Sequence, residues 1–238
     1  MWILTLFLAL VFFAGSYIGT QSWFTLDRLN RSNVLNGALI VLMIFTMLMV
    51  AYVLGFFPQS VAAPFMMTLY SVIAGFFIGY AYRLYNYRTK AGRILYQHRS
   101  FWIDHAPNFL AMILIIYGVY RMAILTNEPV TGIRLTSGLS LICFGLFNWT
   151  LKVVPEFRSK SVILLDRSIR WIDIISWKWQ SESVLKLEFI HEDPKHGERL
   201  AEFSTSIPED ERKEIEIVLK SKMEEFADER KKKLLKED

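Results

Sequence analysis

Apolar residues form five long, almost uncharged segments in the first 151 residues of the chain. A bilayer core about 30 Å thick requires about 20 apolar residues in a helix, because lipid offers no hydrogen-bond partner to an open backbone. The segments that meet this requirement are 2–19, 34–57, 61–82, 108–126 and 135–151. The pattern therefore predicts a membrane all-α bundle of about five transmembrane helices.

The apolar pattern changes to short runs after Pro155. Leu185, Leu187 and Phe189 alternate with polar neighbours, which is typical of a strand with one buried face. Runs of this kind predict about five antiparallel strands, at 162–165, 169–172, 174–179, 184–190 and 198–205. Apolar residues at helical spacing over 215–226 then predict a C-terminal amphipathic helix. The second part of the chain is therefore a small α+β domain.

The charged residues are divided unevenly between these two parts. Of 50 Lys, Arg, Asp and Glu residues, 12 lie in 1–151 and 38 lie in 152–238, with net charges of +6 and −2. Such segregation excludes a water-soluble globular protein for the whole chain. It predicts a transmembrane domain over 1–151 and a water-exposed domain over 152–238.

Basic residues beside the apolar segments predict the orientation of the chain. The loops 20–33 and 83–107 and the chain after Lys152 carry most of the Lys and Arg near the membrane, whereas the loop 58–60 carries no charge. Cytoplasmic loops have an excess of basic residues. We expect a multi-pass protein of a bacterial inner membrane, with its N-terminus outside and its C-terminal domain in the cytoplasm.

The segment between the third and fourth apolar stretches has its own pattern. Apolar residues recur at spacings of three and four over 84–102, and basic residues occupy the other positions. This pattern predicts an amphipathic helix in the cytoplasmic headgroup layer, with the alternative of an elbow packed on the C-terminal domain. The residues expected at the membrane surface are Arg83, Arg88, Lys90, Arg93, Arg99 and Trp102.

Small residues four positions apart form two stripes, Gly15 with Gly19 and Ser71 with Gly75 and Gly79. Such stripes let a neighbouring helix backbone approach closely. We expect them to pack helices within this chain rather than to join two copies.

Few side chains in the membrane part are candidates for chemistry. Arg121 is an ionisable residue within the fourth segment, and its position favours anchoring at the outer headgroups over an ion or substrate pathway. His98, Asp104 and His105 could bind a metal or transfer protons at a membrane face, but their spacing matches no zinc motif. The structural interpretation of this cluster is therefore favoured.

The chain has no motif for a nucleotide or a redox cofactor. It contains one cysteine, Cys143, and neither a Walker A sequence nor a dinucleotide-binding glycine pattern. We therefore expect no bound cofactor and no metal, and we do not expect an enzyme.

The C-terminal part resembles the small bacterial pleckstrin-homology-like (PH-like) domains that are joined to membrane helices. The resemblance covers roughly 155–227 and rests on the turn 166–168, the Ile-Arg-Trp-Ile-Asp-Ile run over 169–174, the Ser-Trp-Lys-Trp run over 176–179, an alternating strand and a closing helix. It implies an interaction or assembly scaffold and no reaction. A full PH fold has seven strands, and the pattern predicts about five, so the barrel is either incomplete or completed by another element.

The charge of the C-terminal domain bears on its partners. A net charge of −2 provides no broad attraction to nucleic acid or to an anionic membrane, so a membrane-protein partner or a second copy is favoured over lipid recognition. The residues expected to form the interaction hairpin are Arg167, Arg170, Trp171, Trp177 and Trp179. The sequence thus favours an anchoring, assembly or regulatory subunit of a membrane complex. A small transporter or channel subunit and a membrane enzyme acting at segment 84–102 stay as alternatives, and any small-molecule ligand is left open.

Overall fold

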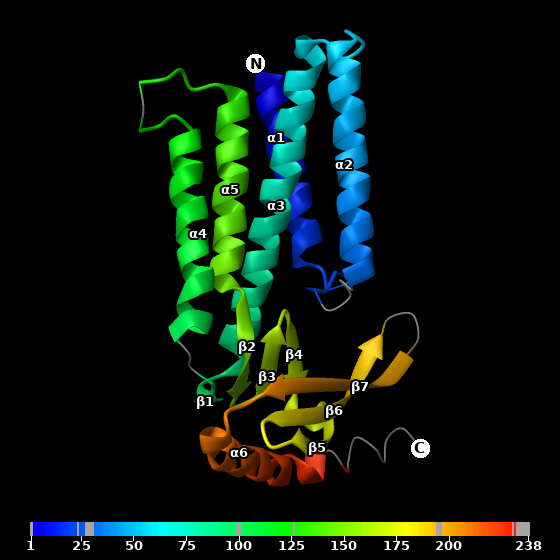
Figure 1. Ribbon diagram of the computed structural model, residues 1–238, viewed down its shortest axis with the longest axis vertical. Coiled ribbons are helices and arrows are strands. Elements are labelled where there is room, and N and C mark those ends of the chain that lie inside the picture. The colour runs from blue at the N-terminus through cyan, green and yellow to red at the C-terminus, as the bar shows by residue number, and fades with distance from the viewer. Residues whose placement is uncertain are drawn as a thin grey trace. The chain divides into compact units, whose positions relative to one another are not determined.

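The chain folds into two compact units, as seen in a computed structural model (Figure 1). The structure describes residues 2–22, 24–26, 31–98, 101–125, 127–193, 197–229 and 231. The first unit comprises residues 1–85 and 105–151, and the second comprises residues 86–104 and 152–238. The second unit therefore includes a stretch that the sequence pattern assigned to the membrane domain.

Helices make up the first unit. They are α1 (Trp2–Thr20), α2 (Arg31–Val53), most of α3 (Gln59–Ala91), most of α4 (Phe101–Arg121) and α5 (Gly132–Thr150). Among the described residues, three stretches are long and apolar enough to cross a membrane, namely Trp2–Thr20, Val34–Val53 and Gln59–Ala91. The membrane character that the sequence predicts is therefore confirmed for α1, α2 and α3.

The helices α4 and α5 form but are not among these three candidate spans. Helix α4 begins at Phe101, so Pro107 lies inside it and its first turns contain polar residues. Helix α5 contains Arg134 and buries the hydroxyl residues Thr136, Ser137 and Ser140. Polar residues lower the mean hydropathy of both helices, which explains why three spans are found where the sequence predicts five.

The two small-residue stripes pack against each other. The sequence predicts packing within the chain but not which helix each stripe contacts. A Cβ atom on Gly15 of α1 would lie 2.8 Å from the Val72 carbonyl oxygen of α3, and one on Gly19 would lie 2.9 Å from the Tyr80 nitrogen. Cβ atoms on Gly75 and Gly79 would overlap the backbone of Phe12 and Ser16. Only glycine leaves room for this contact, so α1 and α3 meet backbone to backbone.

The second unit contains seven strands in two antiparallel sheets within the described residues (Figure 1). One sheet has the order β1 (Ile94–Tyr96), β2 (Lys152–Arg158), β3 (Ser161–Leu165) and β4 (Arg167–Arg170). The other has the order β5 (Ile174–Ser181), β6 (Val184–Asp193) and β7 (Gly197–Ser206), followed by helix α6 (Arg212–Glu225). The five predicted strands thus correspond to β3 to β7, and two further strands complete the sheets.

The prediction of one amphipathic helix over 84–102 is wrong. Helix α3 continues to Ala91, Gly92 has a φ of +80°, and β1 follows at Ile94. A glycine with positive φ ends a helix at little cost, because it has no Cβ. Strand β1 then pairs with β2, with Ile94 opposite Arg158 and Tyr96 opposite Phe157. The alternative of an elbow packed on the C-terminal domain describes this segment correctly.

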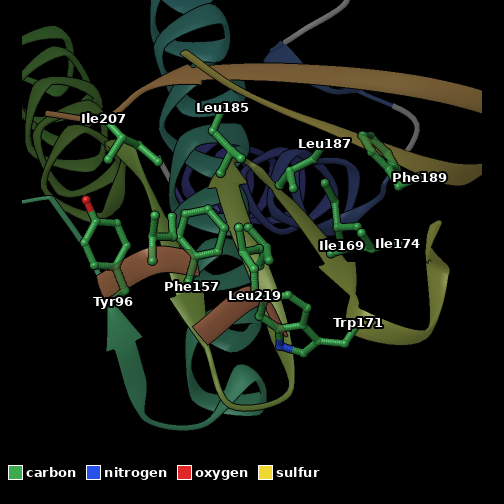
Figure 2. Close-up of a cluster of buried hydrophobic side chains, with 12 residues drawn as sticks. Tyr96, Phe157, Ile169, Trp171, Ile174, Leu185, Leu187, Phe189, Ile207 and Leu219 are labelled. Atoms are coloured by element: carbon green, nitrogen blue, oxygen red, sulfur yellow. The ribbon is translucent and has the colours of Figure 1, made fainter. Parts of the chain in front are cut away.

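The core of the second unit draws side chains from both sheets and from α6 (Figure 2). Trp171, on a short 3-10 turn (Trp171–Asp173) after β4, is fully buried, and its Nε1 donates to the Arg158 carbonyl oxygen at 2.8 Å. Leu185 and Leu187 of β6 and Leu219 of α6 are also fully buried. Tyr96 from β1 belongs to this core, so the segment between α3 and α4 is part of the domain.

Candidate functional site

His98 and His105, two of the three candidate catalytic residues, belong to different units. His98 contacts Glu211 of the second unit, and His105 is an exposed residue of the first unit. The side chain of Asp104 lies outside the described residues. Among the residues that the structure describes, no three His, Cys, Asp or Glu side chains come together as metal ligands.

His98 instead takes part in a clasp between the end of β1 and the start of α6. The Tyr96 hydroxyl donates to Glu211 Oε2 at 2.5 Å, and His98 Nδ1 lies 3.0 Å from Glu211 Oε1. Burial would raise the pKa of the Glu211 carboxyl, but the hydrogen bonds from Tyr96 and His98 outweigh burial and hold this pKa below its usual value. Burial and the hydrogen bond to Glu211 raise the pKa of Tyr96. The clasp therefore favours an ionised Glu211 and a neutral Tyr96.

The lowered pKa of Glu211 predicts an acid-sensitive clasp. Its contribution to stability is complete above the unfolded pKa of about 4.3 and is lost as the pH falls through the lower, folded-state value. Glu211→Gln should remove this acid dependence, at a cost near neutral pH of about 1 kcal/mol, since the carboxylate is partly exposed. The measurement is the thermal unfolding midpoint of the full-length protein in detergent from about pH 6 to pH 3. Glu209→Gln on the same turn is the control, and identical pH profiles for Glu211→Gln and the unaltered protein would contradict the clasp.

The basic residues expected at the membrane surface have different surroundings. Arg83 is only 5% exposed within the chain, whereas the prediction placed it at the membrane surface. Its guanidinium donates to the carbonyl oxygens of Gln21 and Phe24 and lies 4.2 Å from the centre of the Tyr80 ring. Arg83 thus fixes the chain after α1 to α3. Lys90, Arg93 and Trp102 are exposed, and Arg99 lies outside the described residues.

Arg88 belongs to a mostly buried charge cluster on β2. Glu156 has a side-chain exposure of 3%, and its Oε2 accepts a hydrogen bond from Arg158 Nε at 2.8 Å and lies 2.7 Å from Arg158 Nη2 in an ion pair. Arg88 Nε lies 3.7 Å from the same oxygen. Arg158 Nη1 also donates to the carbonyl oxygens of Arg88 and Gly92, at 3.1 Å and 2.8 Å, and so satisfies the last turn of α3. Two guanidinium groups therefore share one carboxylate.

The residues expected in the interaction hairpin are divided between core and surface. Trp171 is wholly buried, whereas the prediction placed it in an interaction hairpin. Trp179 packs against the core, and its Nε1 donates to Glu216 Oε1 at 2.8 Å. Trp177 also packs against the core. Arg170 is the exposed member, although its Nε donates to Asp173 at 2.8 Å, and Arg167 is half-buried.

Arg121 is the last residue of α4 and is exposed. A cationic residue at a helix C-terminus interacts favourably with the helix dipole and can extend toward a polar layer. The role of Arg121 as an anchor at the headgroups stays a prediction.

Sequence reasoning missed Glu156 and Glu211, the two carboxylates on which the local charge clusters depend. Glu156 and Arg158 are two positions apart, so they share one face of strand β2. The sequence would have indicated this pair if β2 had been recognised as a strand. Glu211 carries no such signal, because its partners lie 113 and 115 residues away. Compared with known proteins, the chain matches no family, no curated protein and no solved structure.

Proposed function

We propose that this protein is an integral membrane subunit that holds a PH-like domain at the cytoplasmic face, where the domain binds a membrane-protein partner or a second copy of the chain. In this proposal all five helices cross a bacterial inner membrane, and the N-terminus lies outside. Close glycine contacts support α4 and α5 as a packed pair, since a Cβ on Gly118 would lie 2.8 Å from the Gly138 carbonyl oxygen.

Strand number and order support the PH-like assignment. Seven strands form two antiparallel sheets, in which β1 to β4 and then β5 to β7 pair in chain order, and α6 follows the last strand. Seven strands and a closing helix are what the family resemblance requires. The sequence pattern alone predicted about five.

The observation that carries the proposal is the connectivity of β1. The second unit is built from 86–104 and 152–238, so the chain passes between the two units at three places. A domain on one flexible tether samples a large volume, whereas several connections restrict that volume. Such an arrangement suits a scaffold that presents a surface at a fixed place.

The proposal predicts a stable assembly in mild detergent. Full-length tagged protein, extracted from membranes and measured by native mass spectrometry, should have a mass above that of one chain. An uncomplexed single chain at every protein concentration would overturn the proposed function.

A pair of variants is expected to locate the surface. Leu200 is 63% exposed on β7, which is an edge strand of its sheet within the described residues, and edge strands can add a strand from a partner. Leu200→Glu should therefore reduce the fraction of assembled protein several-fold. Ile217→Glu is the matched control, because Ile217 is 69% exposed on helix α6, where the backbone is already bonded. An equal effect of the two variants would place the partner away from β7.

A further inference from the structure

The end of α3 and the turn between β2 and β3 form one group of basic residues. The backbone nitrogen of Ser159 donates to the Arg93 carbonyl oxygen at 2.9 Å, and that of Lys160 donates to the Ala91 carbonyl oxygen at 3.0 Å. A Cβ on Gly92 would lie 3.8 Å from Lys160 Cγ, so the stem of Lys160 runs beside this glycine. We call this group the α3-end basic cluster, and its members are Arg88, Lys90, Arg93, Arg158 and Lys160.

The α3-end basic cluster has a surplus of positive charge. Glu156 is the carboxylate paired with Arg88 and Arg158. Within the described part of the chain, the side chains of Lys90, Arg93 and Lys160 have no ion-pair partner, and all three residues are exposed. The cluster therefore contains five cationic groups and one buried carboxylate, which is close to two of them. The net charge of −2 over 152–238 concealed this surplus, because three of the cluster's members come from the segment before α4.

Arg88 adds a second reason to expect an anion here. Its side chain is 15% exposed, and its buried Nε and Nη2 make no hydrogen bond within the described structure. A guanidinium group that is removed from water without full pairing costs free energy. Glu156 neutralises only one of the two guanidinium charges beside it. An anion on the open side of the cluster would reduce the cost by balancing the remaining positive charge.

The position of the cluster along α3 indicates where the anion comes from. Helix α3 has 33 residues, so it is about 50 Å long at 1.5 Å per residue, which exceeds the 40–45 Å of a bilayer with its headgroups. All charged residues of α3 are in its last nine positions, from Arg83 onward. Arg88 follows Arg83 by about 7.5 Å along the helix axis, which corresponds to the depth of a headgroup layer.

We propose that the α3-end basic cluster is a binding site for a phosphate group, supplied by an anionic lipid headgroup or by a small soluble phosphate compound. A phosphate on the open side of the cluster would place negative charge beside the Arg88 guanidinium, whose Nε and Nη2 stay buried, while Lys90, Arg93 and Lys160 add positive charge to the site. Arg158 is occupied by Glu156 and by the α3 carbonyls, so it positions the turn and the helix end.

The test is lipid titration of full-length protein in mild detergent, followed by native mass spectrometry. Phosphatidic acid should bind about tenfold more tightly than phosphatidylcholine, since the cluster recognises the exposed phosphate. Arg88→Gln should weaken phosphatidic acid binding about tenfold and Lys160→Gln about fivefold. Lys160 is exposed, so its variant is expected to fold even where Arg88→Gln does not. Lys178→Gln on β5 is the control and should bind like the unaltered protein.

Competition with inorganic phosphate separates the two sources. Preferential lipid binding that millimolar phosphate barely displaces identifies a headgroup site. Phosphate binding that Arg88→Gln and Lys160→Gln weaken, without a preference among lipids, identifies a site for a soluble compound. The proposal is overturned if neither phosphate nor phosphatidic acid binds more tightly than phosphatidylcholine, or if both variants bind like Lys178→Gln.

Discussion

Gly79→Leu is expected to destabilise the membrane unit by roughly 2–3 kcal/mol. A Cβ at this position would lie 2.8 Å from the Ser16 carbonyl carbon and would overlap the carbonyl oxygen itself, so α1 and α3 must move apart. The new side chain would clash with backbone atoms, which cannot move to another rotamer as a side chain can. Separation would also remove the contact of Gly75 with Phe12, so the whole interface is affected. The measurement is the loss of helical circular dichroism of detergent-solubilised full-length protein on heating.

Gly37→Leu is the matched control for this experiment. Gly37 lies in helix α2, and a Cβ there would meet nothing within 4 Å. Both substitutions raise helix propensity by the same amount, so any difference between them reports packing. Gly37→Leu should shift stability by no more than about 0.5 kcal/mol. Equal unfolding temperatures for the two variants would show that α1 and α3 do not rely on this contact.

The sequence pattern correctly predicted the elements that are defined by residues close together in the chain. The apolar length of α1 to α3 and the alternation of Leu185, Leu187 and Phe189 in β6 each define an element without reference to a partner. The small-residue stripes on α1 and α3 also predicted close packing within the chain, because a flat strip lets a backbone approach, but they did not show that these two helices pair.

Strand β1 could not be predicted in this way. It has three residues, and its partner β2 follows only after α4 and α5. The apolar spacing over 84–102 fits a helix as well as it fits the end of one helix, a turn and a strand. The choice depends on Gly92 and on the ladder with β2, and a ladder between distant segments leaves no local signal.

Charged side chains were the least predictable part of the candidate site. Basic residues near an apolar segment usually lie in the headgroup layer, yet Arg83 is buried against the carbonyl oxygens of Gln21 and Phe24. Arg88 is mostly buried, and its Nε lies 3.7 Å from Glu156 on β2, a strand that pairs with β1 just after α3. Such pairing depends on tertiary structure. The excess of basic residues in cytoplasmic loops therefore predicts the orientation of a chain, but it does not predict the partner of each basic residue.

Glu156→Gln is expected to destabilise the second unit by about 3 kcal/mol. The substitution keeps the shape of the side chain and removes its charge. Arg88 and Arg158, with side chains 15% and 13% exposed, would then repel each other without a counter-charge. The measurement is hydrogen exchange of the β2 and β3 amides in the full-length protein, which should lose protection. Glu202→Gln is the control, because Glu202 is 53% exposed beside Lys186 and should contribute less than 1 kcal/mol.

A double variant separates the charge from the packing of Glu156. If the cost of Glu156→Gln comes from an uncompensated guanidinium group, removing one such group should recover part of it. Arg88→Met keeps much of the apolar stem of the arginine and removes its charge, so Glu156→Gln with Arg88→Met should be more stable than Glu156→Gln alone. Arg158 would remain hydrogen-bonded to the α3 carbonyl oxygens in both proteins. A double variant with the sum of the two separate losses would instead mean that each side chain stabilises the fold independently, through its packing and hydrogen bonds.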